Sequence, residues 1–119
     1  MGVRVSYLAA AAAGAMLACP AIAQTATPQD NLDCAIWAAY RIGLATEDEE
    51  RNGLMLATAW FSGLYEGQTG TTIDDAMIAR SKALTPAQIG AFEPACLARF
   101  GDFGDRFTAI GEKLGAGSN

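Results

Sequence analysis

The chain has 119 residues, with 13 acidic and 8 basic side chains, a net charge of −5 and no histidine. Because the chain is acidic and its basic residues form no cluster, it should repel phosphate backbones and anionic membranes, so we expect no nucleic-acid partner. Histidine is the commonest metal ligand and the usual general base, and its absence argues against a metal site, a cofactor and enzymatic activity.

Residues 1–23 have the order of a secretory signal peptide: a positive start at Arg4, an apolar stretch and a small-residue end. The apolar stretch, residues 7–17, is eleven residues long, whereas a membrane-spanning helix needs roughly 20. We therefore expect cleavage after Ala23, no stable membrane anchor and a periplasmic or secreted protein. Cys19 leaves a second possibility open, a lipoprotein that is cut before this cysteine and lipidated on it.

Cleavage after Ala23 would leave two cysteines, Cys34 and Cys96, which are 62 positions apart. In an oxidising compartment, two distant cysteines in a small domain predict one disulfide. A redox-active or metal-binding thiol would need a close partner, such as a second cysteine two residues away or a histidine. The chain offers neither, so we favour a structural disulfide.

The mature chain begins with a polar segment, residues 24–30, which we expect to be a flexible tail. A single helical domain should follow over residues 31–115. Its first helix starts near Asp30 and ends between residues 43 and 45. The acidic run at residues 46–50 could bind a cation, but Thr46 followed by Glu49 fits a capping box, so we favour a helix start.

The next helix should run from Glu47 to Gly67, and residues 53–67 are apolar on every side except at Thr58, Ser62 and Glu66. A helix of that kind is normally the buried, central one. Gly63 would let another helix approach closely, and Gly67 or Gly70 would end the helix.

A third, short helix should begin at residues 72–75, and a fourth at Thr85, which is followed by a first-position proline. Pro94 interrupts this fourth helix. Beyond it, apolar residues recur at spacings of 4, 3, 4, 3 and 4, which predicts one helix face that packs in the core or lines a ligand cavity; we favour the core. The residues of this apolar stripe are Cys96, Phe100, Phe103, Phe107, Ile110 and Leu114.

Together these patterns predict an all-α fold, a small four- to five-helix bundle cross-linked by one disulfide.

The best catalytic grouping that the sequence offers is Tyr65 beside Glu66, with Asp74 and Asp75 nearby in the chain. Carboxylates are common at helix ends for capping reasons, so we expect no enzyme. We instead take Trp60, Tyr65 and Glu66 as candidate binding residues, because rigid aromatic side chains often anchor protein contacts.

In size, helix content and paired cysteines the chain resembles small, single-disulfide, helical periplasmic proteins. Two such groups are the acid-stress chaperones of the HdeA type and the immunity proteins against toxins of type VI secretion. The resemblance rests on Cys34-x-x-Trp37-x-x-Tyr40-x-x-Gly43, on Trp60-x-x-Gly63-x-Tyr65-x-Gly67 and on Cys96. It implies a non-enzymatic protein that binds another protein, as an inhibitor or immunity-type protein; the alternative is an acid- or envelope-stress chaperone.

Overall fold

The computed structural model describes residues 25–117, and within this range it contains five α-helices and no strand. The predicted all-α fold and the single disulfide are confirmed. The predicted signal peptide, its cleavage after Ala23 and the fate of Cys19 lie outside the described residues. The helices are α1 (Pro28–Ile42), α2 (Asp48–Thr69), α3 (Asp74–Lys82), α4 (Pro86–Gly90) and α5 (Glu93–Ala116).

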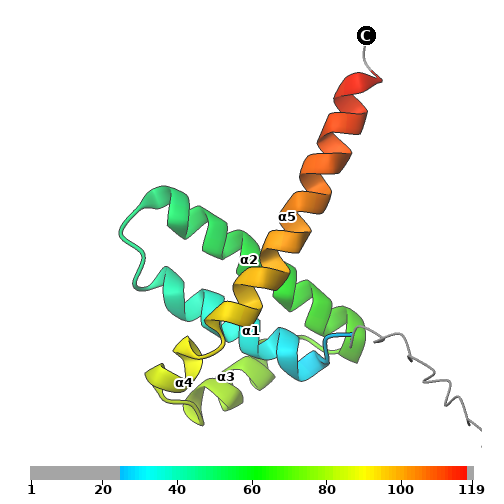
Figure 1. Cartoon of the computed structure of the whole chain (residues 1–119). Helices are drawn as coiled ribbons and strands as arrows, with labels where there is room; N and C mark the ends of the chain where they lie inside the picture. Colours follow the sequence, from blue (N-terminus) through cyan, green and yellow to red (C-terminus); the bar gives the residue numbers. More distant parts are fainter. Residues whose placement is uncertain (1–24, 118–119) are drawn as a thin grey trace, which may run out of the picture.

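Helix α1 is the central helix of the fold, and it contacts all four other helices (Figure 1). It begins at Pro28, inside the segment expected to be a tail, because Thr27 forms a reciprocal capping box with Asp30. Its buried residues include Trp37, which is only 2% exposed. The indole nitrogen of Trp37 donates to the Glu93 carboxylate at 3.2 Å, so the polar atom of this buried ring has a partner.

The prediction that the helix of residues 47–67 is the buried centre is wrong. Helix α2 lies along α1 and fully buries only Leu54, Ala57 and Phe61; Trp60, Leu64 and Tyr65 pack against the core but stay partly exposed, and Met55 and Leu56 are exposed. The predicted capping box is also absent: Glu47 is the N-cap and makes no side-chain capping bond. Of the two glycines expected to end the helix, Gly67 lies inside it and Gly70 ends it; the φ of Gly70, 70°, is left-handed and suits glycine.

Helices α3 and α4 cover one side of α1. The guanidinium of Arg80 in α3 donates to the carboxylate of Asp33 in α1 at 2.9 Å, which fixes α3 on α1. Thr85 forms the expected capping box with Gln88 at the start of α4. The chain then turns into α5, where Pro94 lies in the first turn and not in a helix interior.

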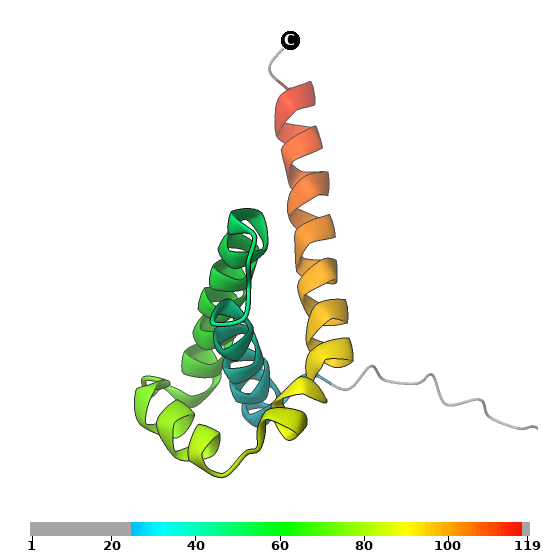
Figure 2. The ribbon, with the colours of Figure 1, turned by 90° about the vertical axis from the view of Figure 1, so that its left-hand side faces the viewer.

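Helix α5 is joined to α1 at its first turns and then leaves the other helices behind. The Cys34–Cys96 disulfide joins the two helices with 5.4 Å between the Cα atoms. Arg41 of α1 donates to Glu93 at 2.6 Å beside this cross-link. In two perpendicular views, the far half of α5 extends alone beyond the other helices (Figures 1 and 2).

Candidate protein-binding surface

The second half of α5 together with its C-cap, residues 104–117, is here called the α5 overhang, and every residue in it is exposed. The apolar stripe predicted for the core is therefore only partly buried, and the core assignment is wrong for its outer half. Phe107 is 56% exposed, Ile110 46% and Leu114 70%. Cys96 is buried, while Phe100 and Phe103 are half-buried. One continuous helix face thus passes from the core into solvent.

A chain of aromatic contacts follows the same path. Phe61 is fully buried and lies 4.8 Å from Trp60, measured between ring centroids. Trp60 stacks on Phe103 at 4.6 Å, and Phe103 contacts Phe107 at 4.6 Å. The exposed Phe107 ring is thus joined to the core by a continuous series of aromatic contacts.

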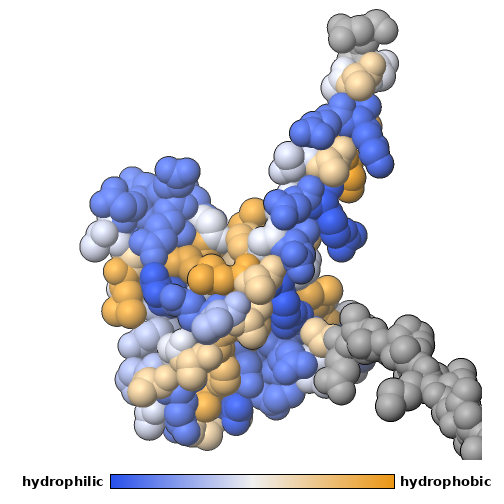
Figure 3. Space-filling model, in the orientation of Figure 1, coloured by the Kyte–Doolittle hydropathy of each residue, from blue (hydrophilic) through white to orange (hydrophobic). Residues whose placement is uncertain are grey.

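Helix α2 carries further exposed apolar residues, in the turns that precede Trp60. Met55 is 56% exposed and Leu56 is 55% exposed. Figure 3 shows hydrophobic atoms where the two helices cross and again along the overhang. A cavity of about 220 Å³ also lies between α1, α2 and the start of α5, with Leu97 and Phe100 among its lining residues. Large exposed apolar patches are typical of sites of protein interaction.

The structure separates the three candidate binding residues. Trp60 is half-buried and belongs to the aromatic contacts just described. Tyr65 is half-buried against the core. The Glu66 carboxylate accepts the backbone N–H of Ile73 at 3.0 Å, which closes the turn between α2 and α3. Trp60 alone therefore lies at the apolar surface, while Tyr65 and Glu66 have structural positions.

The residues that sequence reasoning missed are Leu56, Phe107 and Ile110. The sequence does mark Phe107 and Ile110, because both belong to the predicted apolar stripe. The stripe was interpreted as a core face because the spacing of apolar residues identifies a helix face and does not identify what covers that face. For Leu56 the sequence gives no signal that separates it from the buried Leu54.

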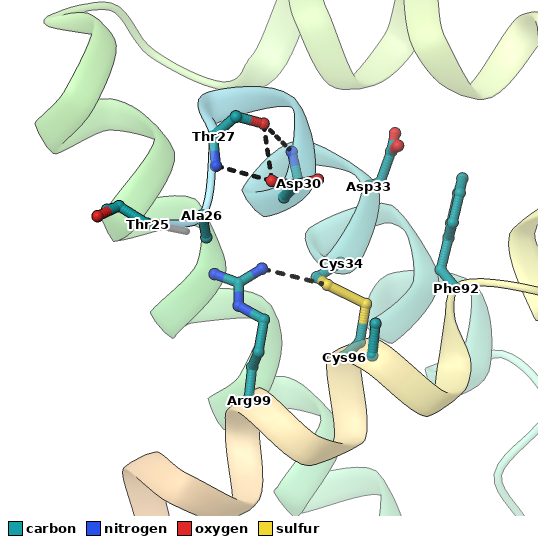
Figure 4. Close-up of a pocket in the computed structure, with 10 residues that line it drawn as sticks. Thr25, Ala26, Thr27, Asp30, Asp33, Cys34, Phe92, Cys96 and Arg99 are labelled. Carbon is teal, nitrogen blue, oxygen red and sulfur yellow. Dashed lines mark hydrogen bonds between the residues drawn. A yellow bond between two sulfur atoms is a disulfide. The ribbon is translucent and has the colours of Figure 1, made fainter. Parts of the chain in front are cut away.

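A cavity of about 630 Å³ lies beside the disulfide, between the start of α1 and α5 (Figure 4). Arg99 forms one wall. Its guanidinium donates to the side-chain oxygen of Asn31 and, at 3.6 Å, to the sulfur of Cys34, and it lies 5.0 Å from the centre of the Phe61 ring. Burial lowers the pKa of Arg99.

The charged groups around this cavity already have partners within the protein. Asp30 accepts from the backbone N–H and the hydroxyl of Thr27, and these bonds lower the pKa of Asp30. Asp33 pairs with Arg80. Asn31 is 1% exposed, accepts from Arg99 and donates to Gln68 of α2 at 2.6 Å. The cavity wall is thus a polar junction that joins α1, α2 and α5, and its groups are already occupied.

Known proteins give no further guide to the site. No protein-family model matches the chain, and comparisons with curated proteins and with solved structures found no match. Among residues 25–117, no group of histidine, cysteine and acidic side chains is placed to hold a metal ion. None of the described helices has the length and apolar content needed to span a bilayer.

Proposed function

We propose that this chain is an exported, non-enzymatic protein that acts by binding another protein, as an inhibitor or immunity-type protein. The observation that carries the proposal is the apolar face of the α5 overhang, where Phe107 and Ile110 are about half exposed. An unstructured apolar segment would have to become ordered on binding, and this ordering would cancel much of its binding free energy. The apolar face of the overhang is already part of a helix, so that cost is smaller.

The contact would be centred on the aromatic residues at the base of the overhang. Phe107 lies against Phe103, and Phe103 lies against Trp60, so a partner would meet a preformed aromatic surface. Aromatic anchors that fill pockets carry most of the energy of many interfaces. The cavity beside Leu97 and Phe100 could receive an apolar side chain of the partner in return.

The sequence supports the exported part of this proposal, because residues 1–23 have the order of a signal peptide. The Cys34–Cys96 disulfide fits an oxidising compartment as well. The sequence also lacks histidine, the usual general base, which favours binding over catalysis.

A photo-crosslinking amino acid in place of Phe107 tests the proposal in the envelope of the producing cell. We expect one adduct between this chain and a different protein. The same amino acid in place of Ala109, which is exposed on another face of α5, is the matched control and should give none. If neither position yields an adduct with a different protein, the proposal is wrong.

The acid-stress chaperone remains the second candidate, and the ionic anchors of α3 and α5 favour it. Arg80–Asp33 and Arg41–Glu93 attach these helices to α1 through ion pairs. In strong acid the 13 acidic side chains of the chain lose their charge while the 8 basic ones keep theirs, so the net charge becomes positive, and the self-repulsion would loosen these attachments and expose more of the apolar surface. The test is suppression of client aggregation at acidic and neutral pH; activity confined to acidic pH would support the chaperone, and none at either pH would exclude it.

A further inference from the structure

We propose that a second copy of this chain occupies the α5 overhang, and that the two overhangs pair antiparallel about a two-fold axis. This inference rests on the proposed role of the overhang as a contact surface and adds a specific occupant to it. The pair would cover the apolar face while no other protein is bound.

The spacing of the stripe fits such a pair. Phe103, Phe107, Ile110 and Leu114 are separated by 4, 3 and 4 residues, so the pattern is the same when read in either direction. A two-fold interface requires a surface that is complementary to itself. In the antiparallel register Phe107 lies opposite Ile110 of the second copy, and Ile110 lies opposite Phe107. Such 4-3 spacing is also what packs two helices knobs into holes.

Glycines line one flank of the stripe and fit the same register. Gly104 and Gly111 lie one residue beyond Phe103 and Ile110 on that flank, and a Cβ atom added at either would meet nothing within 4 Å. Packing within the chain therefore does not require them, although glycine weakens a helix relative to alanine. In the antiparallel register Gly104 lies opposite Gly111 of the second copy, which permits the two helices to approach closely.

The position of α2 decides the direction of the pair. Trp60 of α2 stacks on Phe103 and covers the end of the stripe nearest the core. In a parallel pair both copies of α2 would lie between the two α5 helices and hold them apart. In an antiparallel pair the C-terminal end of the second α5 lies beside Trp60 of the first copy, and only one copy of α2 is present at each end of the pair.

Charge opposes the pair. Arg106 and Lys113 lie on the flank opposite the glycines. In the antiparallel register Lys113 lies beside Arg106 of the second copy, and these like charges repel. We therefore expect added salt to screen the repulsion and to strengthen self-association, since the contact itself is apolar.

The contact is also small. The fourteen residues 104–117 of the overhang span roughly 20 Å of helix at about 1.5 Å per residue. Two such segments bury less than the roughly 1,200 Å² that marks the lower end of stable interfaces. The dimer should therefore be weak and reversible, which leaves the face accessible to a tighter partner.

Analytical ultracentrifugation of the purified, disulfide-intact chain tests the inference. The mean mass should rise from monomer to dimer with concentration, and Phe107→Glu should raise the dissociation constant by at least about tenfold. Ala109→Glu adds the same charge to another face of α5 and should leave the dissociation constant unchanged. A monomer at every concentration, or equal effects of the two variants, would overturn the inference.

Engineered disulfides test the direction. In the antiparallel register a Gly104→Cys chain mixed with a Gly111→Cys chain should form the mixed disulfide, while either variant alone should form few cross-links. Self-cross-linking of a Leu114→Cys chain, whose cysteines would face each other only in a parallel pair, would instead indicate that arrangement and overturn the proposed geometry. The purified chain reports on self-association alone. A monomer that still gives the envelope adduct would refute only this inference, and a dimer without that adduct would refute only the proposed function.

Discussion

Removing the disulfide should cost this fold a large part of its stability. The change is the double substitution Cys34→Ala and Cys96→Ala, which removes two sulfur atoms from positions that are only 3% and 1% exposed. Alanine avoids the buried hydroxyl groups that serine would introduce. The two cysteines are 62 positions apart, and for a closed loop of that length the chain-entropy relation gives about 4 kcal/mol. Typical domains are stable by about 5 to 15 kcal/mol.

The effect should be concentrated on α5, because little else attaches this helix. Without the cross-link, α5 keeps the bonds from Trp37 and Arg41 to Glu93, and the stack of Trp60 on Phe103. Both tryptophans of the chain therefore contact α5. Their fluorescence reports its release directly.

Urea unfolding followed by tryptophan fluorescence and by circular dichroism measures the loss. We expect the free energy of unfolding to fall by about 4 kcal/mol, and hydrogen exchange in residues 93–103 to rise before exchange in α1 does. Chemically reduced wild-type protein is the control and should behave like the double variant. A loss below about 1 kcal/mol, with α5 still protected from exchange, would contradict the reasoning and mean that packing alone holds α5.

Three further variants test the local interactions. Thr27→Ala should lower the free energy of unfolding by about 1 kcal/mol at neutral pH; because the bonds from Thr27 hold the pKa of Asp30 below its ordinary value, urea titrations should show this difference shrinking as the pH falls below about 4 and through that lowered pKa, while the part due to the Thr27 hydroxyl, which accepts the Asp30 backbone N–H, remains. Asn31→Ala removes the acceptor of Arg99 from a buried site and should cost about 1 to 3 kcal/mol by the same assay, whereas a cost near zero would contradict the polar junction. Gly111→Ala should raise the helix content and stabilise the monomer by up to about 1 kcal/mol, yet weaken self-association; stronger association would argue against glycine contact.

The features that the sequence predicted well are local ones. The capping box at Thr85 needs only a cap, a proline and a glutamine within four residues, and it formed as predicted. The stop at Gly70 likewise depends on one residue that tolerates a left-handed backbone. The disulfide was predictable because Cys34 and Cys96 are the two cysteines left after Ala23. In each case the interaction partners are close in sequence or are the only ones of their kind.

The choice of the central helix depended on distant partners, and there the sequence misled. Helix α1 contains Asn31 and Trp37, whose polar atoms argue for exposure until their partners are known. Arg99 and Glu93 supply those partners from more than 50 positions away, so α1 can be buried. Helix α2 looked more apolar but offers Met55 and Leu56 to solvent. Hydrophobicity alone ranks helices by composition, whereas burial depends on which polar groups find partners.

The length of α5 explains both the failed core assignment and the proposed function. Its 24 residues span about 36 Å, whereas the 15 residues of α1 span about 22 Å. Helix α5 crosses α2 at Trp60 and Phe103, which is near the middle of α5. No described helix lies beyond that crossing, so Phe107 and Ile110 stay exposed although they continue the same stripe. An apolar stripe that continues past the helices able to cover it is stable in water chiefly when another chain covers it, and its spacing fits a second α5.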